Sequence, residues 1–242
     1  DHWIFTNGCS YKSMCTKNCT LCGQQKGLLI GLKKRFLKNL PIGFLSEVDL
    51  RLSKNYGYNG YYVSNTTHSL YFDLNNTSNE HRKYNVLIIT YDFNAEYKGY
   101  RKLKKLGMFD SQFLCIGKNA SYYSLNPDSI DGLLDPTGLI KYYLESSIYV
   151  HLSTDESFGK TALEAALAGC FIIAIRNSGP AAFVTEGVNG VLIDSILEFE
   201  QALVKANLLR RNHEFNRVIV QLRQEYKASN LMKLNLALYA NN

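Results

Sequence analysis

The sequence predicts an α/β fold built around a parallel β-sheet. Short apolar runs of strand length recur through the second half of the chain, and helical segments separate them. This alternation gives a parallel sheet with right-handed crossovers, as in a Rossmann-like domain. The composition agrees, because 46% hydrophobic and 20% charged residues among 242 are typical of a globular protein. Strands are expected at residues 86–91, 113–117, 148–152, 171–175 and 191–193.

Three regions follow from this pattern. We expect residues 1–83 to be the remainder of a second α/β domain with a polar linker. Residues 84–194 should form the Rossmann-like domain, and residues 195–242 should be helices that pack back across the domain boundary. The chain begins with Asp1 and not with Met, so an amino-terminal part of a longer protein is expected to precede it.

Shorter elements are expected within each region. Residues 73–83 have no apolar period and predict the linker. The other expectations are strands at 42–46 and 61–64, helices at 47–54, 98–106, 139–146, 181–186 and 197–239, and a loop at 122–136.

The central segment of the chain is TDESFGKTALEAALAG, residues 154–169. It predicts a loop that opens at the carboxyl end of a strand and continues into an alanine-rich helix. Asp155 or Ser157 is expected to cap the start of that helix, and Gly169 its end. Open α/β sheets bind ligands at this edge, and free N–H groups at a helix start favour a phosphate.

Two acids flank this predicted anion site. Glu156 lies in the loop, and Glu164 lies about one and a half turns into the helix. Lys98 follows the first strand of the domain and precedes Gly99, which would let the backbone approach a ligand closely. The letters Gly159-Lys160-Thr161 resemble the end of a nucleoside-triphosphate P-loop. We exclude that motif because Thr154 stands where its first glycine is required.

The spacing of a Glu, seven residues and a second Glu resembles the paired-glutamate motif of retaining glycosyltransferases with the GT-B architecture. SFGKTALEAALAGCFIIAI followed by NSGPAAFVTEGVNGVLI resembles the donor-binding segment of glycosyltransferase family 4. The resemblance implies transfer of a sugar from a nucleoside diphosphate sugar to a glycan or lipid-linked acceptor. It further implies a role in bacterial surface polysaccharide synthesis, and no cofactor for the transfer step.

The same resemblance implies roles for individual residues. Glu156 would contact hydroxyl groups of the donor sugar and act in catalysis, and Glu164 would hold the ribose. Lys98 would bind the donor diphosphate together with main-chain amides of the donor-binding segment, whose expected residues are Ser157, Phe158, Gly159 and Lys160.

A cysteine cluster stands apart from this motif. Cys9, Cys15, Cys19 and Cys22 lie within fourteen residues, and four thiolates could hold a structural zinc ion. DHWIFTNGCSYKSMC resembles a segment of the amino-terminal domain of some family 4 bacterial enzymes, but Asn7 and Gly23 depart from that pattern. Zinc and reduced, unliganded cysteines therefore remain equal alternatives.

The charge is mildly basic, with a net value of +6. It suits an anionic donor and does not indicate nucleic-acid binding. No apolar run is long enough to predict a membrane span. Residues 28–40 are apolar and basic at helical spacing, which indicates a surface helix or, alternatively, a contact with an anionic membrane. We expect a cytoplasmic protein, with peripheral attachment to the inner face of the plasma membrane as a second option.

Three functions are consistent with these observations. The first is an active glycosyltransferase. The second is a truncated, inactive module that only binds the nucleotide sugar. The third is a zinc-dependent interaction protein built on the cysteine cluster.

Overall fold

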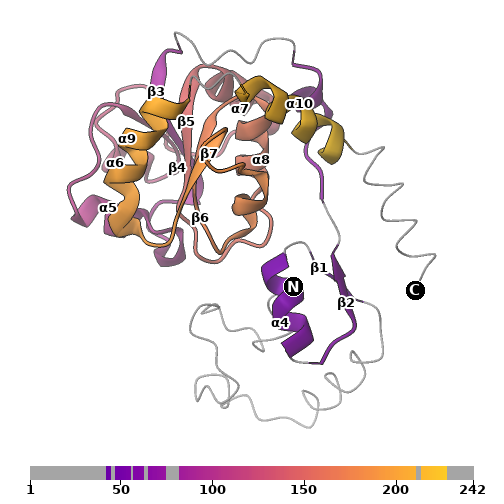
Figure 1. Cartoon of the computed structure of the whole chain (residues 1–242). Coiled ribbons are helices and arrows are strands. Elements are labelled where there is room, and N and C mark those ends of the chain that lie inside the picture. Colours follow the sequence, from indigo (N-terminus) through magenta and orange to yellow (C-terminus); the bar gives the residue numbers. More distant parts are fainter. Residues whose placement is uncertain are drawn as a thin grey trace, which may run out of the picture.

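The computed structural model of the chain describes residues 42–44, 47–55, 57–62, 65–74, 82–210 and 214–227 (Figure 1). The predicted helix at 28–40 and the cysteine cluster lie outside these residues, as do parts of the linker and of the carboxyl-terminal helix.

A five-stranded sheet with the strand order β4-β3-β5-β6-β7 forms the centre of the protein. Every pairing in it is parallel, so the predicted α/β class is confirmed. The chain runs from β3 outward to β4 and then returns across β3 to β5. The sheet therefore has a topological switch point between β3 and β5, where ligands bind in open α/β sheets. The strands are β3 (Tyr84–Asp92), β4 (Phe113–Lys118), β5 (Ser146–His151), β6 (Phe171–Ile175) and β7 (Gly190–Ile193).

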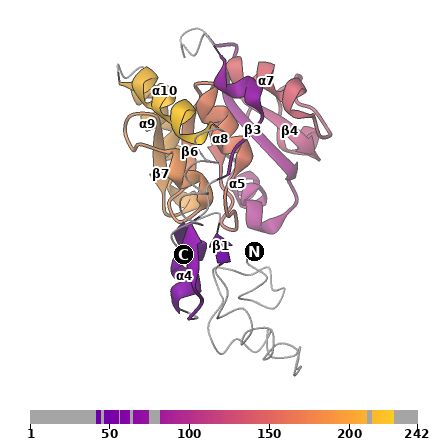
Figure 2. The same cartoon turned by 90° about the vertical axis from the view of Figure 1, so that its right-hand side faces the viewer.

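Helices cover both faces of the sheet, which explains why its strands read as continuous apolar runs. One core cluster joins the sheet to α7 (Pro136–Leu144) and α8 (Lys160–Leu167). The other cluster joins it to α5 (Tyr100–Lys105), α6 (Ala120–Tyr123) and α9 (Phe199–Leu209). Helix α10 (Phe215–Tyr226) contributes to both clusters and lies beside α8 (Figures 1 and 2).

Several predicted boundaries differ from the structure. The helix expected at 197–239 is two helices, α9 and α10, within the described residues, and the helix expected to begin at residue 98 begins at Tyr100. Helix α7 begins at Pro136 and not at residue 139, because the Asp135 side chain accepts a hydrogen bond from the Gly138 amide and caps the helix. Proline is favoured at the first position of a helix, where its missing N–H costs nothing. The expected helix at 181–186 is a short 3-10 helix, Gly179–Phe183. Residues 196–198 and 96–98 also form 3-10 turns.

A second, smaller α/β unit precedes the sheet. Strands β1 (Ile42–Phe44) and β2 (Gly60–Tyr62) pair in parallel, and α4 (Glu47–Asn55) connects them. These elements occupy the places that the sequence predicts.

Residues 65–74 follow β2 and pack against the larger unit. The Thr66 hydroxyl donates to the carbonyl of Tyr226 at 2.8 Å. The buried Tyr71 donates its phenol to the carbonyl of Pro136 at 2.9 Å. Arg223 of α10 donates to the carbonyls of Leu74 and Leu167.

Arg82 forms a similar anchor just before β3. Its guanidinium donates to the carbonyl oxygens of Tyr143 (2.9 Å), Ser146 (2.8 Å) and Ala168 (2.9 Å). Burial lowers the pKa of this guanidinium, and the nearby Cys170 partly offsets the effect. One side chain thereby ties the ends of α7 and α8 to the start of β5.

Candidate functional site

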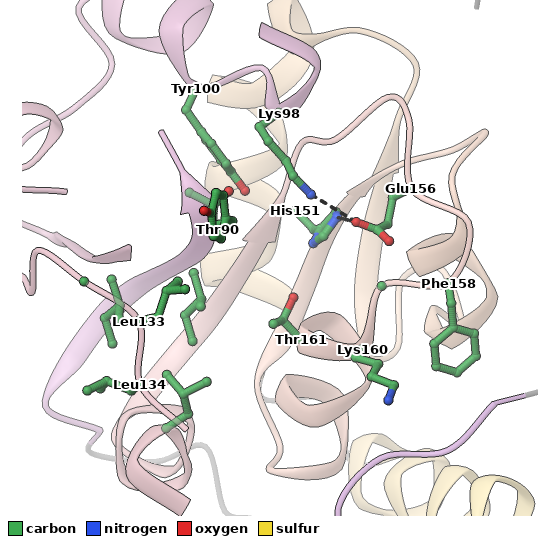
Figure 3. A pocket seen from close by; sticks show the side chains of 16 residues that line it. Thr90, Lys98, Tyr100, Leu133, Leu134, His151, Glu156, Phe158, Lys160 and Thr161 are labelled. Carbon is green, nitrogen blue, oxygen red and sulfur yellow. Dashed lines mark hydrogen bonds and ion pairs between the residues drawn. The ribbon is translucent and has the colours of Figure 1, made fainter. Parts of the chain in front are cut away.

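A cavity of about 360 Å³ opens at the carboxyl ends of β3 and β5. This is the switch point of the sheet. One wall is apolar and includes Leu133 and Leu134, and the opposite wall carries Lys98, His151 and Glu156 (Figure 3). Ile116 also lines the cavity. The remaining lining residues are Ile89, Thr90, Tyr91, Tyr100, Gly132, Leu139, Phe158, Gly159, Lys160 and Thr161.

The start of α8 lies between these two walls and also lines the cavity (Figure 3). Gly159 is its N-cap and adopts a left-handed conformation with φ of 81°. No side chain caps α8, so the expectation that Asp155 or Ser157 would do so was wrong. The sharp turn at Gly159 replaces the extended capping residue that such a side-chain bond requires.

The glycine at position 159 is also required by packing. A Cβ atom there would lie 2.5 Å from Cγ of Pro180. Because no side chain caps α8, the N–H groups of Lys160 and Thr161 have no hydrogen-bond partner within the described part of the chain. Free amides and the positive end of the helix dipole therefore face the cavity.

Lys98 and Glu156 form an ion pair in this cavity. Lys98 ends the 3-10 turn after β3, and its Nζ lies 3.0 Å from Oε2 of Glu156. Burial would raise the pKa of Glu156, but Lys98, His151 and the Gly159 amide outweigh it and hold the pKa below its usual value. The site thus presents an ionised carboxylate and a cation beside the free amides.

His151 and Thr90 are two buried polar residues that the sequence did not single out. His151 is 3% exposed and ends β5, and Thr90 is 6% exposed and lies near the end of β3. Neither side chain has a hydrogen-bond partner among the residues that the structure describes. Burial and the nearby Lys98 lower the pKa of His151 to about 4, so its ring is neutral at pH 7.

Glu164 lies in α8, outside the lining of the cavity. It is 6% exposed. Its Oε1 accepts a hydrogen bond from the Thr67 hydroxyl at 2.5 Å, and its Oε2 accepts one from the Tyr143 phenol at 3.1 Å. Burial raises the pKa of Glu164 despite these two bonds. Glu156 therefore lines the cavity, while Glu164 lies one helical turn behind Lys160 and Thr161.

The other residues expected to bind the donor also differ in whether they line the cavity. Phe158, Gly159 and Lys160 line the cavity, and Ser157 does not.

Metal ligands were expected only at Cys9, Cys15, Cys19 and Cys22, which lie outside the described residues. Within the residues that are described, no group of three or more His, Cys, Asp or Glu side chains could hold a metal ion. Cys115 and Cys170 are buried free thiols. No helix in the described ranges is both long enough and apolar enough to span a bilayer.

Part of the chain is similar in sequence to known proteins. Residues 132–225 match the family model "Glycosyl transferases group 1". A curated relative, the GDP-mannose-dependent alpha-mannosyltransferase of Corynebacterium glutamicum, is 33% identical over 117 residues. That alignment covers 46% of this chain and 28% of the relative.

Several solved structures have a similar fold. A glycosyltransferase from Rickettsia africae has a TM-score of 0.63 at 15% identity, covering 86% of this chain and 66% of its own. The sucrose-phosphate synthase of Thermosynechococcus elongatus has a TM-score of 0.65 at 17% identity, covering 90% and 64%. Anabaena HepE in complex with UDP-glucose has a TM-score of 0.61 at 14% identity, covering 88% and 67%.

These comparisons support the Rossmann-like fold of the larger unit. This chain spans 28% of the length of the curated relative and about two thirds of the solved structures.

Proposed function

We propose that this chain carries the donor-binding part of a retaining glycosyltransferase that uses a nucleoside diphosphate sugar. The observation that carries the proposal is the uncapped start of α8, which faces one cavity together with Lys98 and Glu156. The match of residues 132–225 to the group 1 glycosyltransferases supports it.

The diphosphate fits the basic and amide-lined side of the cavity. The unpaired N–H groups of Lys160 and Thr161 can donate to phosphate oxygens, and the helix dipole favours their negative charge. Lys98 adds a cation within the same cavity. Together these groups stabilise the charge that develops on the leaving diphosphate as its bond to the sugar breaks.

Glu156 fits the role of a contact to the donor sugar. Its ionised carboxylate accepts hydrogen bonds from hydroxyl groups, and Lys98 holds it in place at 3.0 Å. The apolar wall of Leu133 and Leu134 offers a flat partner for the base.

Glu164 retains its proposed role on the ribose under one condition. Thr67 and Tyr143 each donate to one of its carboxylate oxygens, and we propose that a ribose hydroxyl takes the place of the Thr67 hydroxyl. The resulting exchange replaces one hydroxyl donor by another and leaves the buried carboxylate satisfied.

The acceptor is proposed to be a glycan or lipid-linked sugar in bacterial surface polysaccharide synthesis. Peripheral contact with the inner face of the plasma membrane, through residues 28–40, and a structural zinc at the four clustered cysteines belong to the same proposal. Both rest on the sequence alone.

Calorimetry on the full chain tests donor binding. GDP-mannose and UDP-glucose are suitable first probes, because the relative and the HepE complex are named for them. We expect saturable binding of at least one nucleotide sugar and of its nucleoside diphosphate. Glu164→Ala should weaken binding strongly, whereas Lys160→Ala should have a smaller effect because its main-chain amide remains.

Absence of binding to all of these probes at millimolar concentration would refute the proposal. Binding without detectable transfer or hydrolysis of the sugar would instead favour the inactive binding module. Metal analysis of the purified chain addresses the zinc site, which should hold about one ion per chain if it is structural.

A further inference from the structure

His151 lies at the centre of the polar wall of the cavity, although no predicted role includes it. It is the last residue of β5, next to the switch point of the sheet. Figure 3 shows its ring beside the Lys98–Glu156 pair, with Thr161 on the other side.

The imidazole is buried without a hydrogen bond. Nδ1 and Nε2 both lack a partner in the ranges that the structure describes. Nε2 lies 3.8 Å from Oε2 of Glu156, too far for a hydrogen bond, and that oxygen is held by Lys98 at 3.0 Å. A buried polar group without a partner is unfavourable, so a bound ligand that pairs with it gains affinity.

The neutral ring has both hydrogen-bonding functions, because one nitrogen carries a proton and the other accepts one. We propose that His151 and Glu156 together recognise one hydroxyl group of the donor sugar. The imidazole N–H donates to the hydroxyl oxygen, and the hydroxyl proton is donated to the carboxylate. This inference rests on the proposed function and assigns a specificity role at the same site.

The geometry favours a hydroxyl over a phosphate at this position. With 3.8 Å between Nε2 and Oε2, a single oxygen can lie about 2.8 Å from both atoms. A phosphate oxygen has no proton to donate and would be repelled by the ionised Glu156. A hydroxyl both donates and accepts, which is what the pair offers. The phosphates are instead proposed to bind Lys98 and the amides at the start of α8.

Two variants of His151 separate the sugar contact from the rest of the site. His151→Leu keeps an apolar side chain of similar reach but removes both nitrogens. His151→Gln keeps an amide nitrogen near the position of Nε2. Binding is measured by calorimetry for the nucleotide sugar that the wild type binds best and, separately, for the matching nucleoside diphosphate.

We expect His151→Leu to weaken binding of the nucleotide sugar about tenfold or more and to change binding of the nucleoside diphosphate less than about twofold, in line with one hydrogen bond at a buried site. His151→Gln should stay within about threefold of the wild type for both ligands. Deoxy analogues of the sugar extend the test. Removal of the recognised hydroxyl should weaken binding to the wild type more than binding to His151→Leu, in which only the contact with Glu156 remains.

Equal weakening for both ligands, or no weakening for the nucleotide sugar, would overturn the inference while leaving donor binding intact. Failure of the wild type to bind either ligand would overturn the proposed function as well. If thermal denaturation shows that His151→Leu does not fold, His151→Asn replaces it. Its shorter amide should lose affinity for the sugar alone relative to His151→Gln, and equal affinities of the two variants would count against the contact.

Discussion

The Thr67 hydroxyl donates a hydrogen bond to Oε1 of Glu164 at 2.5 Å, across 97 residues of sequence. The second carboxylate oxygen accepts from Tyr143 at 3.1 Å. A segment that precedes the sheet therefore already occupies the carboxylate that the donor ribose is proposed to use. If the ribose binds at Glu164 as proposed, it competes with the docking of residues 65–74 for the same atom.

Replacement of Thr67 by valine should separate these two roles. Thr67→Val removes the hydroxyl and leaves Oε1 of Glu164 without a donor, which should lower the free energy of unfolding by about 1–3 kcal/mol. The same change should tighten binding of the nucleoside diphosphate severalfold, because the ribose no longer displaces an internal bond. Thermal denaturation and calorimetry measure the two effects.

Thr66→Val is the matched control for this prediction. The Thr66 hydroxyl donates to the Tyr226 carbonyl, so its loss should reduce stability without tightening binding. Weaker binding by Thr67→Val would contradict the ribose role of Glu164.

The two glutamates should respond to pH in opposite directions. Burial raises the pKa of Glu164, so the folded state holds that proton more tightly than the unfolded chain. Ionised Glu164 therefore costs stability at high pH, and this cost is relieved as the pH falls through its folded pKa. Glu164→Gln should be more stable relative to wild type at pH 8 than at pH 5.

Glu156→Gln provides the opposite case. The pKa of Glu156 is lowered, so its stabilising charge is present above the unfolded pKa and lost as the pH falls through the folded pKa. Glu156→Gln should be less stable than wild type at pH 8, and the difference should shrink in acid. Denaturant unfolding at several pH values measures both variants, and curves of the same sign would show that the two carboxylates do not differ as described.

Loss of the Lys98 ammonium should affect both stability and binding. Lys98→Met leaves the largely buried Glu156 carboxylate without its cation, which should cost about 1–3 kcal/mol of stability. Affinity for the nucleoside diphosphate should fall about tenfold or more, since a charged contact to phosphate is lost.

Lys118→Met is a control with similar chemistry on the surface. Its side chain is 68% exposed and its Nζ lies 3.8 Å from Oδ2 of Asp92, so the ion pair should contribute at most about 1 kcal/mol. A loss of affinity in Lys118→Met equal to that in Lys98→Met would point to a general effect of charge and not to a contact in the cavity.

The glycine at the start of α8 should not tolerate a side chain. Gly159→Ala combines a left-handed conformation with a Cβ that would lie 2.5 Å from Pro180, so the loop must shift. We expect a loss of stability well above the roughly 1–2 kcal/mol of left-handed strain alone, together with weaker diphosphate binding. Gly187→Ala has nearly the same φ, +80°, and no atom within 4 Å, and it should show the strain alone. Similar stability of the two variants in thermal denaturation would argue against the close approach.

The sheet could be predicted from the sequence because its strands are buried on both faces. Runs such as residues 171–175 are continuously apolar, and only a parallel, helix-covered sheet accounts for them. The proximity of Glu156 and Lys98 could also be predicted. Their loops follow β5 and β3, which are neighbouring parallel strands, so both loops lie at the same edge of the sheet.

Features that depend on distant contacts could not be predicted. The cap of α8 was misassigned because nothing local to Ser157 reveals that Pro180 packs against Gly159. The position of Glu164 depends on Thr67, 97 residues earlier. His151 looked like any residue of a buried strand, and only its lack of partners in three dimensions distinguishes it. The start of α7, in contrast, was readable from Asp135 and Pro136 and was missed.

The hydrogen bonds of Arg82 and Arg223 limit where a shorter fragment of the protein can begin. Arg82 precedes the first strand of the sheet, yet carbonyl oxygens from α7, β5 and α8 depend on its guanidinium. Arg223 likewise reaches back to the carbonyl of Leu74. A fragment designed to start at β3 would lack both the Arg82 guanidinium and the Leu74 carbonyl, so an isolated domain intended for binding studies should begin before residue 65.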